Sequence, residues 1–302
     1  MAVSDHIMDM PFRAERRVAE WGVQFLLEAA KVAAGVECAV GTQDVLDVAY
    51  GKFSEQRLDV HVPANAQDAP IVVHVHGGGF RMLSKETHRH VALKFRDAGF
   101  LTVNVEYRKA PGARFPSAHQ DFAAALQWVA RHAADLGGDV TRVILVGESA
   151  GAHILTSWML DQHASHPRFQ RAALTVRGFV PICGLFAISP QFRGSERLTV
   201  PARLEVERVH LTARGENDLR YDPAVMAQML AFPDLPPSLI VAGDSDPLWF
   251  QSQDLRTSLA RQSDSTLQTF DGGHGFHFFT WTDSSRAAFA SILAFAHECT
   301  RN

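Results

Sequence analysis

Short apolar runs alternate with segments of helical period along most of the chain from residue 45 onward. This alternation is typical of crossover units that build a parallel sheet. The runs at 71–76, 143–146 and 239–242 are almost unbroken in apolar residues, as expected of strands that are covered on both faces. The pattern predicts eight strands, at 45–50, 57–62, 71–76, 101–106, 142–147, 177–182, 238–243 and 266–270.

The first two predicted strands alternate apolar and polar residues and are separated by Gly51-Lys52. We therefore expect them to form an antiparallel hairpin at the edge of an otherwise parallel sheet. Helical periodicity predicts the helices that cover the sheet, at 85–98, 117–134, 150–162, 223–231, 248–261 and 284–298.

Two further segments predict elements outside the sheet. Apolar residues recur with a helical period between residues 11 and 34, so we expect an N-terminal cap helix within 1–40, either packed on the domain or serving as a lid. The segment 185–222 is too long for a plain crossover and is expected to form an insertion over the sheet. Because no repeat, low-complexity tract or linker is visible, residues 1–302 are expected to form a single domain.

Composition excludes several classes of protein. The 302 residues are 46% hydrophobic and 21% charged, and the net charge of −4 is spread without acidic or basic blocks, so neither disorder nor nucleic-acid binding is indicated. The three cysteines are far apart and outside any CxxC pair, which argues against a disulfide framework.

Location is predicted only by default. Charged residues precede any long apolar run at the N-terminus, and no uncharged apolar stretch approaches about 18 residues. A cytoplasmic protein without a membrane span is the resulting expectation. The sequence leaves the oligomeric state open, with a homodimer as one option.

The sharpest chemical signal is Gly147-Glu148-Ser149-Ala150-Gly151, which follows a predicted buried strand and opens a predicted helix. This is the context of a G-x-S-x-G nucleophile elbow, in which small residues let the backbone turn tightly and project the serine hydroxyl. The competing interpretation is a strand-to-helix turn that happens to contain serine. The context favours Ser149 as a nucleophile.

A second motif, His76-Gly77-Gly78-Gly79-Phe80, follows the strand ending at His76. Backbone N–H groups exposed by glycines can stabilise the negative charge that acyl transfer places on a carbonyl oxygen. We expect the oxyanion hole to be formed by the N–H groups of Gly77 and Gly78, with Ala150 beside the nucleophile. A Rossmann fingerprint starting at Gly77 would need glycine where Met82 stands, so a phosphate loop is disfavoured.

A serine nucleophile needs a base, and the base needs an orienting acid. His274 lies in a glycine-rich loop after the last predicted strand and is the favoured base, with His277 as the rival. Asp246 and Asp244 follow the preceding strand. Asp246 is the favoured acid, although a position before proline also suits a helix N-cap.

No metal or cofactor is expected. Three pairs of histidines lack a Cys or carboxylate partner at the spacing of a metal site; they are His88/His90, His163/His166 and His274/His277.

These motifs together resemble those of the hormone-sensitive-lipase-like esterases and the neighbouring arylformamidase-like branch of the α/β hydrolases, over roughly residues 45 to 298. The resemblance rests on the motifs at 76–80 and 147–151, on Asp246-Pro247-Leu248 and on His274-Gly275-Phe276. It implies an α/β-hydrolase fold, with a mostly parallel eight-stranded sheet and helices on both faces. Glu148 stands where the lipase-like branch usually has aspartate, and Ala152-His153 after the elbow is closer to the formamidase-like branch.

The expected activity is hydrolysis of small carboxylic esters through an acyl-enzyme on Ser149. Bulky residues suggest a modest apolar pocket lined by Phe80, Trp249 and Phe276, and hence short acyl chains. The alternatives are an amidase acting on N-formylkynurenine-like substrates, since fold alone does not choose between the two bonds, and a non-catalytic ligand-binding protein.

Overall fold

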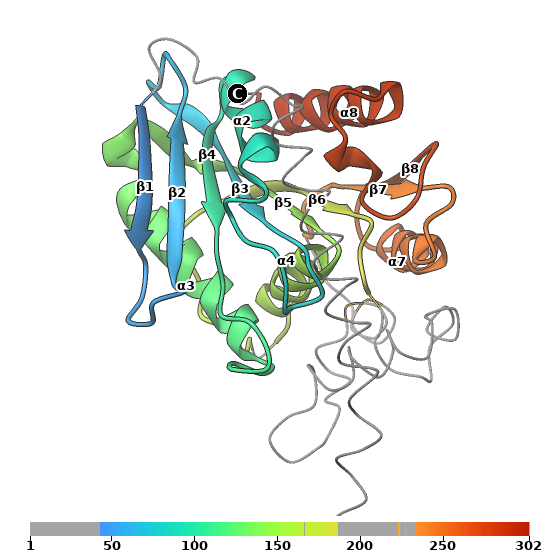
Figure 1. The fold of residues 1–302 in the computed structure, drawn as a ribbon, viewed down its shortest axis with the longest axis horizontal. Helices are drawn as coiled ribbons and strands as arrows, with labels where there is room; N and C mark the ends of the chain where they lie inside the picture. Colours follow the sequence, from blue (N-terminus) through green and yellow to red (C-terminus); the bar gives the residue numbers. More distant parts are fainter. Residues whose placement is uncertain (1–42, 166, 187–222, 224–226, 228–233, 302) are drawn as a thin grey trace, which may run out of the picture.

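The computed structural model describes residues 43–165, 167–186, 223, 227 and 234–301. Within them lies one eight-stranded sheet with the order β1-β2-β4-β3-β5-β6-β7-β8 (Figure 1). The strands are β1 (Gln43–Ala49), β2 (Arg57–Val62), β3 (Ala69–Val75), β4 (Leu101–Val105), β5 (Gly138–Glu148), β6 (Val176–Ile182), β7 (Ser238–Gly243) and β8 (Ser265–Phe270). The predicted mostly parallel eight-stranded sheet is confirmed.

The antiparallel part of the sheet is confined to one edge. β1 pairs with β2 and β2 with β4 in antiparallel register, whereas every pair from β4 to β8 is parallel. The expected edge hairpin is therefore present. An irregularity in β1 between Val45 and Val48, where Asp47 has a φ of 55°, interrupts the exposed edge, as is common in strands that must not pair with another chain.

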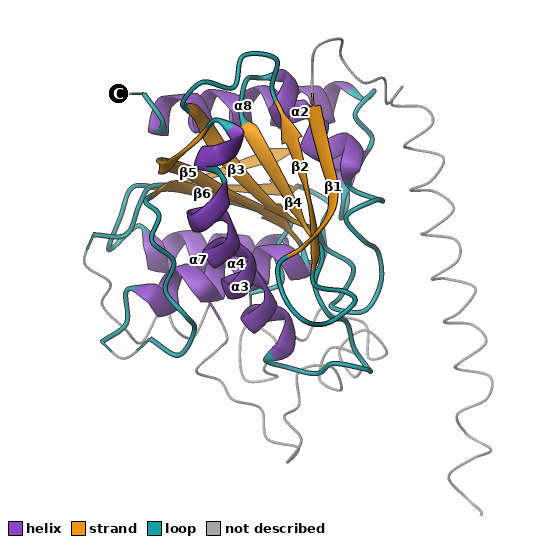
Figure 2. Cartoon of the chain, turned by 90° about the vertical axis from the view of Figure 1, so that its left-hand side faces the viewer, coloured by secondary structure: helices purple, strands orange, loops and turns teal. Residues whose placement is uncertain are grey.

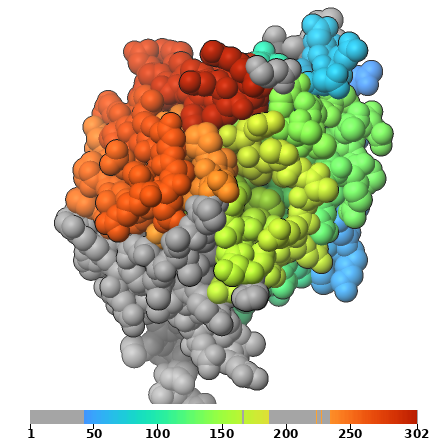
Figure 3. Space-filling model, turned by 180° about the vertical axis from the view of Figure 1, so that it is seen from behind, coloured from blue at the N-terminus to red at the C-terminus, as the bar shows by residue number. Residues whose placement is uncertain are grey.

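Helices cover both faces of the sheet (Figure 2). One face carries α2 (Arg89–Asp97) and α8 (Asp283–Cys299), and the other carries α3 (Ser117–His132), α4 (Ala150–Gln162) and α7 (Trp249–Leu259). Two short 3-10 turns, η1 (Ala134–Leu136) and η4 (Phe276–Phe278), join these elements. Seen from behind, the segment from β7 to α8 (orange to red) lies against the green and yellow segments before it (Figure 3).

The central strands supply side chains to two cores, one on each face. In β5, Ile144 and Val146 belong to the core under α2 and α8, while Val143 and Leu145 belong to the core under α3, α4 and α7. All four are fully buried. A strand covered in this way has no polar face, which explains its unbroken apolar sequence.

The first helix after β3 begins later than the predicted residue 85. Ser84 and Thr87 hydrogen-bond to each other through side chains and backbone, with Thr87 Oγ1 donating to the Ser84 carbonyl at 2.7 Å. Such local bonds compete with helical hydrogen bonds, so the regular helix starts at Arg89.

Several predicted elements lie outside the described residues. These are the cap helix in 1–40, the insertion at 185–222 beyond residue 186, and most of the helix at 223–231. No helix in the described part of the chain has the length and apolar character needed to span a bilayer.

Candidate active site

Ser149 lies at a tight turn between β5 and α4. Its backbone has φ 48° and ψ −113°, a conformation that non-glycine residues rarely adopt and that requires support from the surrounding structure. Gly151 makes the turn possible, because a Cβ there would lie 2.1 Å from the Val75 carbonyl oxygen. The first turn of α4 therefore packs directly on the end of β3, and the Ser149 side chain is presented at the carboxyl end of the sheet.

The structure brings together three residues that are far apart in the sequence. His274 Nε2 lies 3.0 Å from Ser149 Oγ, and His274 Nδ1 lies 3.0 Å from Asp246 Oδ2. Asp246 is buried, while the His274 side chain keeps 40% of its surface exposed, so a substrate can reach the imidazole. The arrangement can pass a proton from the hydroxyl to the imidazole while the carboxylate orients the ring.

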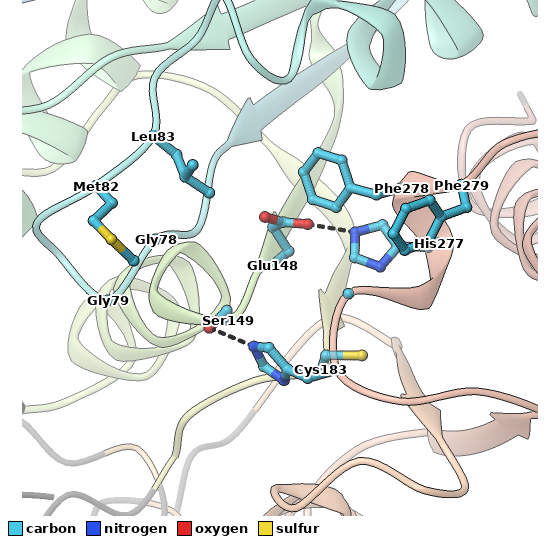
Figure 4. Close-up of a pocket in the computed structure, with 12 residues that line it drawn as sticks. Gly78, Gly79, Met82, Leu83, Glu148, Ser149, Cys183, His277, Phe278 and Phe279 are labelled. Carbon is cyan, nitrogen blue, oxygen red and sulfur yellow. Dashed lines mark hydrogen bonds and ion pairs between the residues drawn. The ribbon is translucent and has the colours of Figure 1, made fainter. Parts of the chain in front are cut away.

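The two alternative candidates, Asp244 and His277, form hydrogen bonds with other groups. Asp244 is exposed and accepts a hydrogen bond from the Gly272 N–H at 3.1 Å. His277 is buried and its Nε2 bonds to the Glu148 carboxylate (Figure 4). Asp246 also accepts from the Leu248 N–H at 2.8 Å, so it caps the turn before α7 and contacts His274 at the same time.

Burial and neighbouring charges shift the pKa values of the titratable groups in this site. Burial opposes ionisation of Asp246, but the hydrogen bond and charge of His274 outweigh it and lower the pKa of that carboxyl. Desolvation opposes protonation of His274, yet its hydrogen bond to Asp246 and the charges of Asp246 and Glu148 raise the pKa of the ring. Burial and the Asp246 charge raise the pKa of the Cys183 thiol, which is therefore neutral.

The glycine loop after β3 is held firmly beside Ser149. His76 Nδ1 lies 2.7 Å from the Gly77 carbonyl oxygen and its Nε2 lies 3.0 Å from Glu106 Oε1. The Tyr107 hydroxyl donates to the Gly77 carbonyl, and its ring stacks on His76. Gly78 has a φ of 102°, and a Cβ there would lie 2.2 Å from the Met82 carbonyl oxygen, so this position requires glycine.

One expected oxyanion donor is already occupied. The Gly77 N–H donates to Glu148 Oε1 at 3.2 Å, so it does not fit the predicted role. Gly78 and Gly79 both line the cavity that contains Ser149. Ala150 is the first residue of α4, where N–H groups have no acceptor within the helix.

A cavity of about 350 Å³ opens beside Ser149 (Figure 4). Its apolar wall comes from Met82 and Leu83 on one side and from Phe278 and Phe279 on the other, and Glu148, Cys183 and His277 also line it. An apolar cavity with a few polar groups is the usual form of a small-molecule site.

The three predicted pocket residues do not line this cavity, so that prediction is wrong. Phe80 is 3% exposed and packs edge-on against His153. Phe276 is buried and stacks on Phe270, and Trp249 packs against Phe250. The sequence shows that these residues are aromatic, but it does not show the direction in which their side chains point.

Among the described residues, the donor atoms of Cys183, Asp246 and His274 lie within 4.8 Å of one another. The Asp246 carboxylate and His274 Nδ1 are already paired with each other. The grouping is thus explained by the proton-transfer arrangement, and we assign no metal to it.

The strand order and the serine turn at the end of β5 place the chain in the class of α/β hydrolases. Residues 72–278 match the family model described as alpha/beta hydrolase fold, and the chain belongs to that family. The resemblance found in the sequence motifs is thereby confirmed.

Relatives and solved structures agree with this assignment. The chain is 33% identical over 193 residues to esterase LipI of Mycobacterium tuberculosis, a match that covers 60% of this chain and 57% of LipI. It is 38% identical over 109 residues to carboxylesterase NlhH of the same species, covering 35% of this chain and 34% of NlhH. The chain thus spans less than two thirds of the length of each of these relatives.

Two solved structures extend over nearly the whole chain. The carboxylesterase EstE1 from a metagenomic library is 27% identical with a TM-score of 0.75, covering 94% of this chain and 98% of its own. Esterase B from Lactobacillus rhamnosis has a TM-score of 0.83 at 20% identity, with coverage of 97% and 96%, which shows the shared fold.

Proposed function

We propose that this protein is a serine esterase that cleaves small carboxylic esters through an acyl-enzyme. The observation that carries the proposal is His274, which reaches Ser149 Oγ with one nitrogen and Asp246 with the other, both at 3.0 Å. The names of the relatives, esterase and carboxylesterase, support ester hydrolysis over the amidase alternative.

In the proposed reaction, Ser149 Oγ attacks the ester carbonyl carbon while His274 Nε2 takes the hydroxyl proton. His274 then gives this proton to the departing alcohol, and Asp246 holds the ring through Nδ1–H. Water, deprotonated by the same imidazole, adds to the acyl-enzyme and releases the acid.

The carbonyl oxygen becomes negatively charged in each step. We assign its stabilisation to the N–H groups of Gly78, Gly79 and Ala150, in place of the initially expected Gly77, Gly78 and Ala150. Each well-placed donor of this kind lowers the barrier by about 2.7–4 kcal/mol. The bond from Gly77 to Glu148 leaves that first glycine to anchor the loop.

The cavity beside Ser149 supports short acyl or alcohol groups. Its volume of about 350 Å³ lies near the lower end of the range for ligand pockets, roughly 300–1,000 Å³. Leu83, Phe278 and Phe279 would contact the apolar part of the ester.

A fluorophosphonate probe and a substrate panel test the proposal. We expect the probe to label Ser149, and p-nitrophenyl acetate and butyrate to be turned over faster than the palmitate. Ser149→Ala should lose both labelling and turnover while keeping its circular dichroism spectrum. Absence of labelling on the folded protein, or faster cleavage of an aryl formamide than of any ester, would contradict it.

The cytoplasmic location and the homodimer remain predictions from the sequence. Cell fractionation and light scattering on the purified protein would test them.

A further inference from the structure

Glu148, the residue directly before Ser149, is a buried carboxylate with three partners. Its Oε1 accepts from His88 Nε2 at 2.6 Å and from the Gly77 N–H at 3.2 Å, and its Oε2 bonds to His277 Nε2. The side chain is 5% exposed. Burying an ionised carboxylate is unfavourable unless hydrogen bonds compensate it, and these partners provide that compensation.

The three partners belong to three separate segments around the nucleophile. His88 is the residue before α2, Gly77 begins the glycine loop, and His277 lies on η4. Figure 4 shows Glu148 between the loop of Gly78 and Leu83 on one side and His277 on the other. One carboxylate thus connects both walls of the cavity to the backbone of Ser149.

Two of these connections, through Gly77 and through His277, lie close in the sequence to a group expected to take part in the reaction. Gly77 is followed directly by Gly78, and His277 comes three residues after His274. A shift of either segment would move an oxyanion donor or the base relative to Ser149 Oγ. Displacements of about 1 Å in such a site can lower the rate about 100-fold.

The charge of Glu148 is also placed to act on His274. Burial alone would raise the pKa of Glu148, but the neighbouring His88 and His277 rings outweigh this effect and hold it well below its ordinary value. The titratable groups that interact with this carboxylate lie just before and within α2, just before and on η4, on β3 and after β4; they are His88, His90, His274, His277, His74 and Tyr107. The His76 ring lies behind them, 5.4 Å from the His88 ring. Beyond His76 lie Glu106 and Lys109.

We propose that Glu148 is a positioning residue for the reaction, holding the glycine loop and the His274 loop in register with Ser149 and favouring, through its negative charge, the imidazolium that forms during acyl transfer. This inference rests on the proposed esterase function. It assigns a role to a residue that the motif itself leaves variable.

Two substitutions separate the effect of the Glu148 charge from the effect of its hydrogen bonds to the two loops. Glu148→Gln keeps the size and an acceptor but removes the charge, whereas Glu148→Asp keeps the charge and shortens the reach by one methylene. The matched control is Asp161→Asn. Asp161 is a buried carboxylate near the end of α4, and it accepts from the backbone N–H groups of Arg168 and Phe169.

The assay is hydrolysis of p-nitrophenyl butyrate from about pH 5 to about pH 9, with rates expressed per site titrated by a fluorophosphonate. For Glu148→Gln we expect kcat to fall about 10- to 100-fold with little change in KM, and the acid limb of kcat/KM to move to lower pH. For Glu148→Asp we expect a lower kcat with the acid limb near that of the wild type. Asp161→Asn should retain the wild-type kcat and profile per titrated site.

The inference is overturned if folded Glu148→Gln keeps kcat within about twofold, or loses activity without any movement of the acid limb. Should Glu148→Gln fail to fold, an unchanged kcat in Glu148→Asp overturns it and a reduced kcat with an unchanged limb supports it. Failure of the proposed esterase function is distinguished by the wild-type protein, which would then show neither labelling nor turnover.

Discussion

Replacing Asp246 by asparagine tests which ring nitrogen of His274 carries the proton. In the native site Asp246 accepts from the Leu248 N–H at 2.8 Å and from His274 Nδ1 at 3.0 Å, and the Cys183 thiol also bonds to it. An asparagine that keeps its oxygen on the Leu248 N–H must turn its NH₂ group toward His274. The ring then accepts at Nδ1 and carries its proton on Nε2, which faces Ser149 Oγ and can no longer accept the hydroxyl proton.

The size of the effect follows from two losses of stabilising hydrogen bonds. If the amide flips, the buried Leu248 N–H loses its acceptor, which costs about 1–3 kcal/mol. The imidazolium also loses a charged partner, and hydrogen bonds to charged groups contribute about 1.5–3 kcal/mol. Together these effects predict a decrease in kcat of about 10²- to 10⁴-fold for Asp246→Asn.

The measurement is kcat for p-nitrophenyl butyrate, normalised to circular dichroism and thermal melting. Asp244→Asn is the matched control, because Asp244 is exposed and its Oδ1 accepts from the Gly272 N–H, a bond that the amide oxygen of asparagine can retain. We expect this control to stay within about twofold of the wild type. A loss of less than about tenfold in Asp246→Asn, or an equal loss in Asp244→Asn, would refute the assignment of the orienting acid.

Four other outcomes can be measured. Because the environment of His274 raises the pKa of the ring and the base must be neutral, kcat/KM should rise with pH through a midpoint above about 6.5; a midpoint at or below this value contradicts the assignment. In Gly151→Ala the new methyl group would meet the Val75 carbonyl at 2.1 Å, so urea titration should show at least about 1–3 kcal/mol of lost stability, and wild-type stability would be inconsistent with the packed turn. Phe279→Ala enlarges the cavity and should raise the rate on octanoate relative to acetate esters; an unchanged ratio would remove Phe279 from the substrate site. Burial lowers the pKa of His90 to about 4, so below about pH 6.5 the unfolded state binds more protons than the folded state. The free energy of unfolding should therefore decrease by about 2 kcal/mol between pH 7 and pH 5, and urea titrations should find this decrease reduced in His90→Gln.

The arrangement of the site along the chain was predictable because its parts directly follow strands. The glycine loop comes after β3, Ser149 after β5, Asp246 after β7 and His274 after β8. Parallel strands end at the same edge of a sheet, so polar residues just after them converge there. The position of each motif directly after a predicted strand therefore predicted which segments meet at Ser149.

Which atoms are engaged could not be predicted, since this depends on contacts between segments. The sequence contains three consecutive glycines with nothing to distinguish the first, yet the Gly77 N–H bonds to Glu148. Phe80 and Phe278 are both aromatic residues beside a motif, but only Phe278 faces the cavity. The direction of a side chain in a loop depends on the local backbone conformation, which the hydrophobic periodicity of the sequence does not determine.

Glu148 illustrates how a variable motif position can depend on the rest of the chain. Its carboxylate spans the distance between His88 Nε2 and His277 Nε2, and an aspartate would be one methylene shorter. The identity of residue 148 is thus coupled to two histidines that lie 60 and 129 positions away. A buried charge is tolerated when hydrogen-bond donors compensate it, so a residue without a donor at 88 or 277 should favour a neutral or shorter residue at 148. The residue before the nucleophile is then fixed by the histidines that surround it rather than by the turn in which it lies.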